Sequence, residues 1–360
     1  MKPSFHTLKV KDVRRETPEC VSVSFDVPAS LSRAFQFRPG QYLTFKKSLS
    51  GNEVRRSYSI CSSPLDGELR VAIKKLDGGV FSTFANDVLK VGDELETMTP
   101  EGRFGIELDP KAQRSYLMIA AGSGITPIIS LTKAILAQEP QSQVTLIYGN
   151  KTKGTIIFKN EIEALKNRHL ERLSVYHVLS RERAEAEFLA GRIDAKKCDY
   201  LLEKLITPST IDHAFLCGPE EMILSARDVL LAKGVAAEKV HFELFFSAKS
   251  HAKKVQATMG DSRASGEASE ILLKLDGIET TFTLGFEGEN ILDAALKNGV
   301  DLPFACKGGV CATCRAKIES GTVEMDVNYS LAPDEVAAGF VLTCQAHPRS
   351  PNVKVNFDIK

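Results

Sequence analysis

The chain has 360 residues, which is longer than an ordinary single domain and suggests two or three domains of roughly 100–150 residues each. Lysine and arginine number 46, as do aspartate and glutamate, so the net charge is zero, which argues against a protein that coats nucleic acid. No apolar run reaches the roughly 18 residues of a membrane span, and the first residues lack the apolar segment of a signal peptide. We therefore expect a globular cytoplasmic protein without nucleic-acid or membrane partners.

Charge is unevenly distributed along this neutral chain. Residues 267–360 contain 14 acidic and 8 basic side chains, a net charge of −6, so the remainder carries +6. Segments of opposite charge attract one another or bind different partners. We expect a partner of the acidic segment to present a basic surface, and its interaction to weaken with salt.

Residues 1–108 are predicted to form short β-strands. Apolar and polar side chains alternate in several stretches that are separated by turns containing glycine or proline. One short helix is expected near residues 82–90. Many short strands with one helix are typical of an antiparallel barrel or sandwich. The predicted strands are 21–27, 41–48, 55–60 and 68–75.

From Tyr116 onward, strands and helices alternate. Residues 116–121 form a continuous apolar strand that leads into an apolar helix. This alternation is typical of βαβ units around a parallel sheet, whose ligands bind at the carboxyl ends of the strands. The predicted helices are 127–138, 159–168, 197–206 and 220–233.

A segment without periodicity separates this part from the C-terminal block. Residues 248–268 are rich in serine, alanine, lysine and glycine, which predicts a linker. Residues 269–360 are expected to open with a hairpin, to continue with a helix near 290–298 and to close with short strands. The chain is thus predicted to be multidomain: an antiparallel β-barrel (1–108), a parallel-sheet α/β domain (109–247), the linker, and an α+β domain (269–360).

Four of the eight cysteines lie in the last 55 residues. Their spacing is Cys306-x4-Cys311-x2-Cys314, and Cys344 follows after 29 further residues. This is the plant-type spacing for a [2Fe–2S] cluster, in which each iron binds two thiolates and two bridging sulfides. Two adjacent glycines in the first interval allow the backbone to wrap around such a group. A zinc site and free thiols are the alternatives, but zinc usually takes two C-x2-C pairs and Cys344 has no second cysteine nearby.

Flavin-binding residue types gather at the end of one predicted barrel strand. Tyr58 supplies a flat aromatic ring, Ser59 a hydroxyl donor, and Arg56 a cation for phosphate. The segment Gly-Gly-Val-Phe-Ser (78–82) then offers backbone amides at a helix N-terminus, which suit a pyrophosphate. The alternatives are an edge strand with a partly buried tyrosine and an ordinary strand-to-helix turn.

Nucleotide-binding signals follow in the alternating segment. Residues 120–127 resemble a dinucleotide fingerprint, although Pro127 replaces its third glycine. The segment Cys-Gly-Pro-Glu-Glu-Met (217–222) lies at a strand end, and Ser180 and Arg181 lie at another. The alternative for Cys217 is an ordinary buried strand cysteine. The alternative for Ser180 and Arg181 is a solvated turn.

Together these segments resemble a known family. Five of them match the ferredoxin–NADP reductase superfamily in order and spacing: RSYS (56–59), GGVFS (78–82), GSGITP (122–127), CGPEEM (217–222) and HFELF (241–245). The C-terminal block is similar to a plant-type ferredoxin. The resemblance implies an FAD-binding β-barrel, an NAD(P)-binding α/β domain and a β-grasp ferredoxin domain.

The resemblance also implies residue roles. Ser59 near flavin N5, Cys217 at the site of hydride transfer and Phe245 as the ring that covers the flavin are expected to be catalytic. The tandem Phe245-Phe246 departs from the commoner pattern of one aromatic followed by a small residue, so which ring stacks stays open. The expected cofactor contacts are Arg56, Ser57, Tyr58, Ser59, Ile60, Gly79, Val80, Phe81, Ser82, Gly122, Gly124, Thr126, Pro127, Ser180, Arg181, Gly218 and Pro219. The expected cluster ligands are Cys306, Cys311, Cys314 and Cys344.

The implied activity is an electron relay from NADPH through FAD and a [2Fe–2S] cluster to the oxygenase component of a multicomponent oxygenase. NADPH is favoured over NADH because Ser180-Arg181-Glu182 resembles a 2′-phosphate site and no carboxylate suited to a ribose is evident. FAD is favoured over FMN by the segment 78–82. A ring-hydroxylating or steroid-hydroxylating oxygenase is the alternative acceptor, and a redox-sensing module without NADPH turnover is an alternative of another class.

Overall fold

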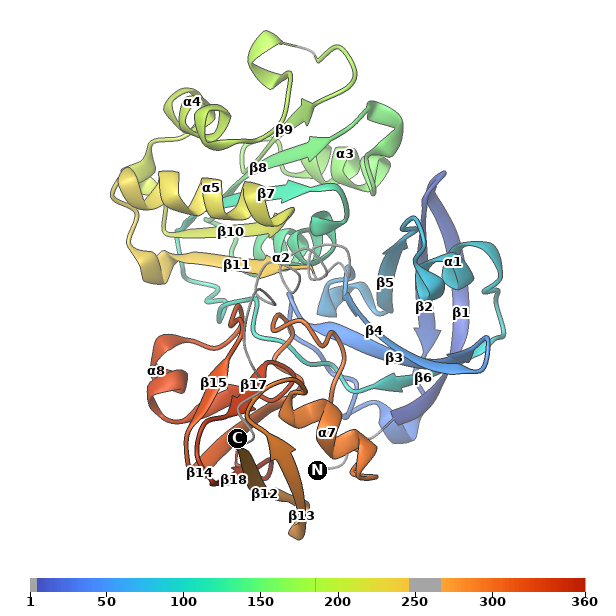
Figure 1. Cartoon of the computed structure of the whole chain (residues 1–360). Helices are drawn as coiled ribbons and strands as arrows, with labels where there is room; N and C mark the ends of the chain where they lie inside the picture. The colour runs from blue at the N-terminus through green and yellow to red at the C-terminus, as the bar shows by residue number, and fades with distance from the viewer. Residues whose placement is uncertain (1–4, 185, 246–266, 360) are drawn as a thin grey trace. The chain divides into compact units, whose positions relative to one another are not determined.

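The computed structural model describes residues 5–184, 186–245 and 267–359 (Figure 1). The chain divides into two compact units, of which the larger consists of Thr7–Val54 and Tyr58–Phe245 and the smaller contains the C-terminal block. The predicted linker at 248–268 falls almost entirely outside the described residues. None of the helices in the described ranges has both the length and the apolar character that crossing a bilayer requires.

A six-stranded antiparallel sheet opens the chain, in the order β4-β3-β6-β1-β2-β5. A bridge between Ile60, directly after β4, and Val71 of β5 joins the two edge strands and closes the sheet into a barrel. Phe81 of the helix α1 is 1% exposed and stacks on Phe45 at 6.0 Å, so this helix packs against the core of the barrel. The elements are β1 (Phe5–Thr17), β2 (Cys20–Asp26), β3 (Tyr42–Leu49), β4 (Asn52–Ser59), β5 (Leu69–Lys74), α1 (Val80–Asp87) and β6 (Glu94–Met98).

A five-stranded parallel sheet follows, in the order β11-β10-β7-β8-β9. The strands are buried, as expected when helices cover both faces of a sheet. The chain leaves β7 toward β8 and later returns to β10 on the other side, so the order reverses at the β7–β10 pair. The elements are β7 (Ser115–Ala121), α2 (Ile125–Gln138), β8 (Gln143–Asn150), α3 (Lys159–Arg168), β9 (Leu173–Leu179), α4 (Ala195–Leu205), β10 (His213–Gly218), α5 (Glu220–Ala232) and β11 (Val240–Leu244).

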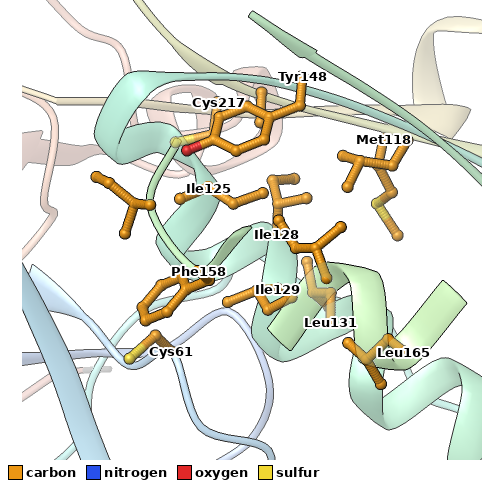
Figure 2. Close-up of a cluster of buried hydrophobic side chains, with 14 of the residues drawn as sticks. Cys61, Met118, Ile125, Ile128, Ile129, Leu131, Tyr148, Phe158, Leu165 and Cys217 are labelled. Atoms are coloured by element: carbon orange, nitrogen blue, oxygen red, sulfur yellow. The ribbon is translucent and has the colours of Figure 1, made fainter. Parts of the chain in front are cut away.

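Barrel and parallel sheet share one apolar cluster within the larger unit. Cys61, two residues after the end of the barrel strand β4, lies beside Phe158 and the apolar face of α2 (Figure 2). The hydroxyl of Ser130 on α2 donates to the Ser62 carbonyl oxygen at 2.7 Å, and both groups are buried. Helix α2 therefore packs against both sheets.

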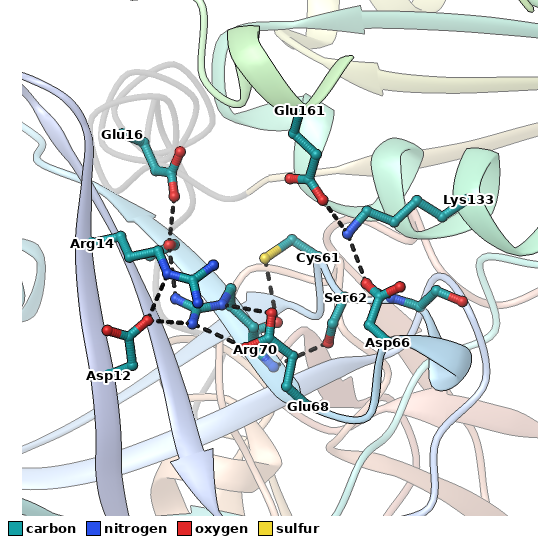
Figure 3. A network of polar contacts seen from close by, with 12 residues as sticks. Asp12, Arg14, Glu16, Cys61, Ser62, Asp66, Glu68, Arg70, Lys133 and Glu161 are labelled. Carbon is teal, nitrogen blue, oxygen red and sulfur yellow. Dashed lines mark hydrogen bonds and ion pairs between the residues drawn. The ribbon is translucent and has the colours of Figure 1, made fainter. Parts of the chain in front are cut away.

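A polar network lies beside this cluster (Figure 3). Lys133 of α2 bridges Asp66 of the barrel part at 2.7 Å and Glu161 of α3 at 2.5 Å. Arg70 of β5 binds Asp12 at 2.6 Å, and this hydrogen bond lowers the pKa of Asp12. The network borders a cavity of about 640 Å³ whose lining contains none of the predicted site residues.

Two histidines meet at the amino ends of β10 and β11. His213 Nδ1 and His241 Nε2 are 3.1 Å apart, and the His241 ring stacks on Phe215 at 4.7 Å. Burial and the neighbouring His213 lower the pKa of His241 to about 4. Burial, followed by the charge of Arg114, also lowers the pKa of His213.

We expect this pair to make the larger unit less stable in mild acid. An unfolded histidine binds a proton near pH 6.5, whereas folded His241 does so only near 4, so the unfolded state binds more protons in this window. The free energy of unfolding should fall by about 1–2 kcal/mol between pH 7.5 and 5, after allowance for solvent screening. Urea unfolding of the wild-type protein and His241→Gln at both pH values measures the effect. An equal pH dependence in both proteins would contradict the assignment.

The smaller unit contains a mixed five-stranded sheet in the order β13-β12-β18-β14-β16, with β12 and β18 parallel. Its predicted hairpin is confirmed, and the two turn residues Asp276 (φ 52°) and Gly277 (φ 75°) have the left-handed backbone of a tight hairpin turn. Asn290 caps the predicted helix through the backbone N–H of Asp293 at 2.9 Å. The elements are β12 (Ala268–Leu275), β13 (Ile278–Gly285), α7 (Ile291–Lys297), β14 (Arg315–Ser320), β15 (Val323–Met325), α8 (Pro333–Ala337), β16 (Phe340–Leu342), β17 (Ala346–Pro348) and β18 (Asn352–Asn356).

Candidate functional site

The predicted flavin strand is the end of β4. The Tyr58 ring is half-buried and packs on Phe81 at 5.6 Å and Phe45 at 6.2 Å, so the barrel core fixes its position. Arg56 is exposed, and its guanidinium donates to the Arg55 carbonyl oxygen at 2.7 Å. The structure places four of the predicted residues within β4 and the fifth directly after it: Arg56, Ser57, Tyr58 and Ser59, followed by Ile60.

The predicted pyrophosphate turn leads into α1. Gly79 is the N-cap residue and supplies no side-chain hydrogen bond, so no side chain at this cap covers the first amides of the helix. A Cβ on Gly79 would lie 2.4 Å from Ser82 Oγ. The Ser82 hydroxyl accepts from Leu76 N–H at 3.1 Å and donates to the Gly79 carbonyl oxygen at 3.2 Å, so this side chain shapes the turn. Val80 is 51% exposed, whereas Phe81 faces the barrel core.

The nucleotide fingerprint lies where the strand order reverses, which is the usual ligand crevice of such sheets. Gly124 packs directly on the end of β10, and a Cβ there would lie 2.1 Å from the Cys217 carbonyl oxygen. No side chain can occupy this position without moving backbone. The glycine therefore holds the start of α2 against β10.

The rest of the fingerprint is equally fixed. Gly122 has a left-handed backbone (φ 54°), and its carbonyl oxygen accepts a hydrogen bond from the Tyr148 hydroxyl at 3.0 Å. Thr126 and Pro127 are buried in the first turn of α2, and the Thr126 hydroxyl donates to the Ser123 carbonyl oxygen at 3.0 Å. The predicted contacts therefore form one rigid turn.

Cys217 is wholly buried near the end of β10, and burial raises the pKa of its thiol well above the ordinary value. It is therefore a neutral thiol at physiological pH. Gly218 follows at the strand end, where a Cβ would lie 2.6 Å from Met222 Cε. Pro219 is exposed and is the N-cap residue of α5.

A carboxylate that the sequence interpretation missed joins the two halves of this site. Glu243 of β11 is paired in register with Cys217 and accepts a hydrogen bond from the Ser59 hydroxyl at 3.1 Å. Ser59 is only 4% exposed and Glu243 is half-buried, so the bond is partly shielded from water. A lone acid within the apolar strand HFELF was the available signal. Phe245, two residues later, is 39% exposed, and Phe246 lies outside the described residues.

Ser180 and Arg181 lie together at the carboxyl end of β9. The Ser180 N–H donates to the Asn150 carbonyl oxygen at 3.0 Å, and the Arg181 N–H donates to that of Lys151 at 2.8 Å. These bonds place both residues beside the end of β8, and the Arg181 side chain is exposed. The neighbouring Glu182 carboxylate accepts the Lys153 N–H at 2.7 Å.

The cysteine loop of the smaller unit adopts a strained backbone. Gly309 has a positive φ of 74°, as the sequence predicts, but Lys307 and Ala312 also have φ values of 52°. Left-handed backbone is unfavourable for residues with a Cβ, so the surrounding structure imposes this wrapped shape. Lys307 is held by Asp293 at 2.5 Å.

The four thiols form two pairs. Hydrogen bonds couple Cys306 with Cys311 and Cys314 with Cys344, and the four thiols also interact electrostatically. These bonds lower the pKa of Cys306 and Cys344 and raise that of their partners. The Gly308 N–H donates to Cys306 Sγ at 3.2 Å. Two thiols for each of two irons, with amide donors on a sulfur, fit a [2Fe–2S] cluster.

Among the described residues, no three His, Cys, Asp or Glu side chains gather closely enough to hold a single metal ion.

Comparison with known proteins assigns all three parts. The family model for the oxidoreductase FAD-binding domain matches residues 7–106, that for the oxidoreductase NAD-binding domain matches 118–228, and that for the 2Fe-2S iron-sulfur cluster binding domain matches 273–349. A subunit of 1,2-phenylacetyl-CoA epoxidase from Escherichia coli K12 is 43% identical over 99% of each chain. The ferredoxin reductase component of 3-ketosteroid-9-alpha-monooxygenase from Mycobacterium tuberculosis is 34% identical, over 98% of this chain and 95% of that one.

Solved structures share the fold. Phthalate dioxygenase reductase superposes with a TM-score of 0.60 at 21% identity, and the match covers 99% of this chain and all of that one. An intact type IV self-sufficient cytochrome P450 monooxygenase gives a TM-score of 0.70 at 19% identity and covers 98% of this chain, which spans 41% of that protein's length. The predicted combination of barrel, parallel α/β domain and ferredoxin domain is confirmed.

These matches define an FAD- and [2Fe–2S]-dependent NAD(P)H oxidoreductase. The chain belongs to the family of oxygenase reductases that includes this component of phenylacetyl-CoA epoxidase, and it passes electrons from a pyridine nucleotide through FAD and the cluster to an oxygenase component.

Proposed function

We propose that this chain delivers electrons from NADPH to the oxygenase component of a phenylacetyl-CoA 1,2-epoxidase in phenylacetate catabolism. The observation that carries the proposal is the 43% identity, over 99% of the chain, to the matching component of that enzyme in Escherichia coli. The match to the steroid monooxygenase reductase is lower, at 34%. The segments 301–314 and 328–335 resemble the epoxidase component most specifically.

The residues at the strand ends position the reacting groups. When bound, FAD accepts a hydride from the nicotinamide, and the cluster carries electrons singly. We assign to Ser59 the contact at flavin N5, because the hydrogen bond to Glu243 fixes the orientation of its hydroxyl. In our assignment Phe245 would cover the flavin ring when no nicotinamide is bound, and Cys217 would contribute a neutral thiol at the crevice.

Backbone and cations hold the phosphates. In our assignment, Arg56 and the open amides after Gly79 bind the FAD pyrophosphate. Gly122 and Gly124 allow the nicotinamide dinucleotide to approach the α2 N-terminus. The four cysteines Cys306, Cys311, Cys314 and Cys344 hold the cluster as two pairs.

NADPH is our proposed electron donor in preference to NADH. Ser180 and the exposed Arg181 supply a hydroxyl and a cation beside the end of β8, where Asn150 stands instead of a carboxylate. The nearby Glu182 carboxylate already accepts the Lys153 N–H. We place the protein in the cytoplasm, where thiols stay reduced, because none of its eight cysteines, all of which lie in the described ranges, forms a disulfide.

The proposal is tested by coupled turnover. We expect the purified protein, mixed with a phenylacetyl-CoA epoxidase oxygenase component, to consume NADPH and form the epoxide in near-equal amounts, measured by absorbance and mass spectrometry. NADH should support this reaction less efficiently. A steroid-hydroxylating oxygenase component serves as the matched control. Product from the control but none from the epoxidase component would refute the proposed acceptor.

A further inference from the structure

A buried carboxamide lies beside the fourth cysteine of the cluster loop. Gln345 is 1% exposed and stands between β16 and β17. Its backbone N–H donates to the Leu342 carbonyl oxygen at 2.8 Å, and its backbone carbonyl oxygen accepts from the Asp326 N–H at 2.9 Å. Backbone hydrogen bonds alone therefore fix the position of this residue, independently of its side chain.

The side chain connects the two parts of the chain that carry the cysteines. Gln345 Nε2 lies 3.1 Å from the Lys307 carbonyl oxygen, 2.7 Å from the Cys344 carbonyl oxygen and 3.6 Å from Cys344 Sγ. The two carbonyl oxygens fix the orientation of the amide, because a reversed group would set its own oxygen against them. The amide nitrogen has two hydrogens and three acceptors, so the hydrogen directed at Cys344 is shared between its carbonyl oxygen and its Sγ in a three-centre bond.

The oxygen of the same amide lowers the free energy of unfolding. Gln345 Oε1 is buried and has no hydrogen-bond partner among the described residues. A buried acceptor left without a partner destabilises the folded state, and methionine would fill a similar volume without it. Packing alone therefore does not account for a glutamine here, since only an amide can donate to the two carbonyl oxygens and to Cys344 Sγ together.

We propose that the Gln345 carboxamide raises the reduction potential of the [2Fe–2S] cluster by donating a hydrogen bond to the Cys344 sulfur. The proposal rests on the assignment of Cys344 as a cluster ligand. One electron added to the cluster adds one negative charge, part of which lies on the coordinating sulfurs. An N–H donor stabilises this more negative state more than the oxidised one.

The variant Gln345→Met tests the proposal because it removes the donor and keeps similar volume. We expect the equilibrium constant for one-electron uptake to fall about tenfold, which is about 59 mV, with iron and acid-labile sulfide contents unchanged. Dye-mediated titration followed by absorbance and electron paramagnetic resonance measures the potential. The matched control is Thr343→Val, which removes a buried hydrogen bond of 2.9 Å to the Cys314 carbonyl oxygen instead of a sulfur. Its potential should stay at the wild-type value.

A measurement on the wild-type protein decides the matter even if the variant assembles no cluster. Gln345 is the sole glutamine of residues 267–360, so side-chain ¹⁵N-labelled glutamine marks one site in this block. We expect a ¹⁵N hyperfine coupling to the reduced cluster. An unchanged potential in loaded Gln345→Met, or no coupling in the wild-type protein, overturns the proposal. Wild-type protein without iron and sulfide would instead overturn the cluster assignment itself and this proposal with it.

Discussion

Replacing Cys311 with alanine is expected to abolish the iron–sulfur chromophore and to lower NADPH-driven cytochrome c reduction by at least about 100-fold. Cys311 forms one thiol pair with Cys306, so alanine leaves one iron with a single protein ligand. Ferricyanide reduction should stay within about twofold, since it draws electrons from the flavin in the other unit.

The measurements are iron and sulfide content, the visible spectrum and the two acceptor assays. Cys198→Ala is the matched control, because it makes the same substitution at a cysteine of α4, outside the cysteine loop. It should retain the cluster and both activities. A Cys311→Ala protein with normal sulfide content would remove this residue from the ligand set.

Replacing Gly124 with alanine is expected to slow flavin reduction by NADPH by about tenfold or more, while the FAD content stays normal. The new Cβ would lie 2.1 Å from the Cys217 carbonyl oxygen, and backbone cannot yield as a flexible side chain does. The start of α2 or the end of β10 must move, and both border the nucleotide crevice. The strain should also destabilise the larger unit by about 1–3 kcal/mol.

Stopped-flow bleaching of the flavin and urea unfolding measure these two effects. The control Gly154→Ala adds the same methyl group in the same part of the chain, but its nearest atom is Thr152 Oγ1 at 4.0 Å. It should behave like the wild-type protein. Wild-type bleaching rates in Gly124→Ala would show that the close approach at Cys217 has no part in hydride transfer.

Much of the fold follows from periodicity. Apolar runs alternating with amphipathic segments predicted βαβ units around a parallel sheet, and the helix expected at 159–168 is α3. By contrast, β1 was not predicted, although it has 13 residues. Its pairing with β2 shifts register between Val10 and Asp12 and again between Arg15 and Thr17, so its side chains do not keep a period of two.

The candidate site shows the same division. Motif spacing led us to predict the cysteines and the glycines as site residues, because their chemistry depends on residue type and interval. The hydrogen bond between Ser59 and Glu243 joins residues 184 positions apart, and only the placement of β11 beside the barrel reveals it. The left-handed backbone at Lys307 could not be predicted, since neighbouring structure overrides the residue's own preference.

The β-bridge that closes the barrel has a consequence for how the sequence can evolve. Ile60 forms this bridge with Val71 and directly follows Ser59, the residue we place at the flavin. Substitutions that weaken this bridge would displace the Ser59 hydroxyl as well. Heat resistance and turnover are therefore not independent traits at this point, and selection for either acts on the same short stretch of backbone.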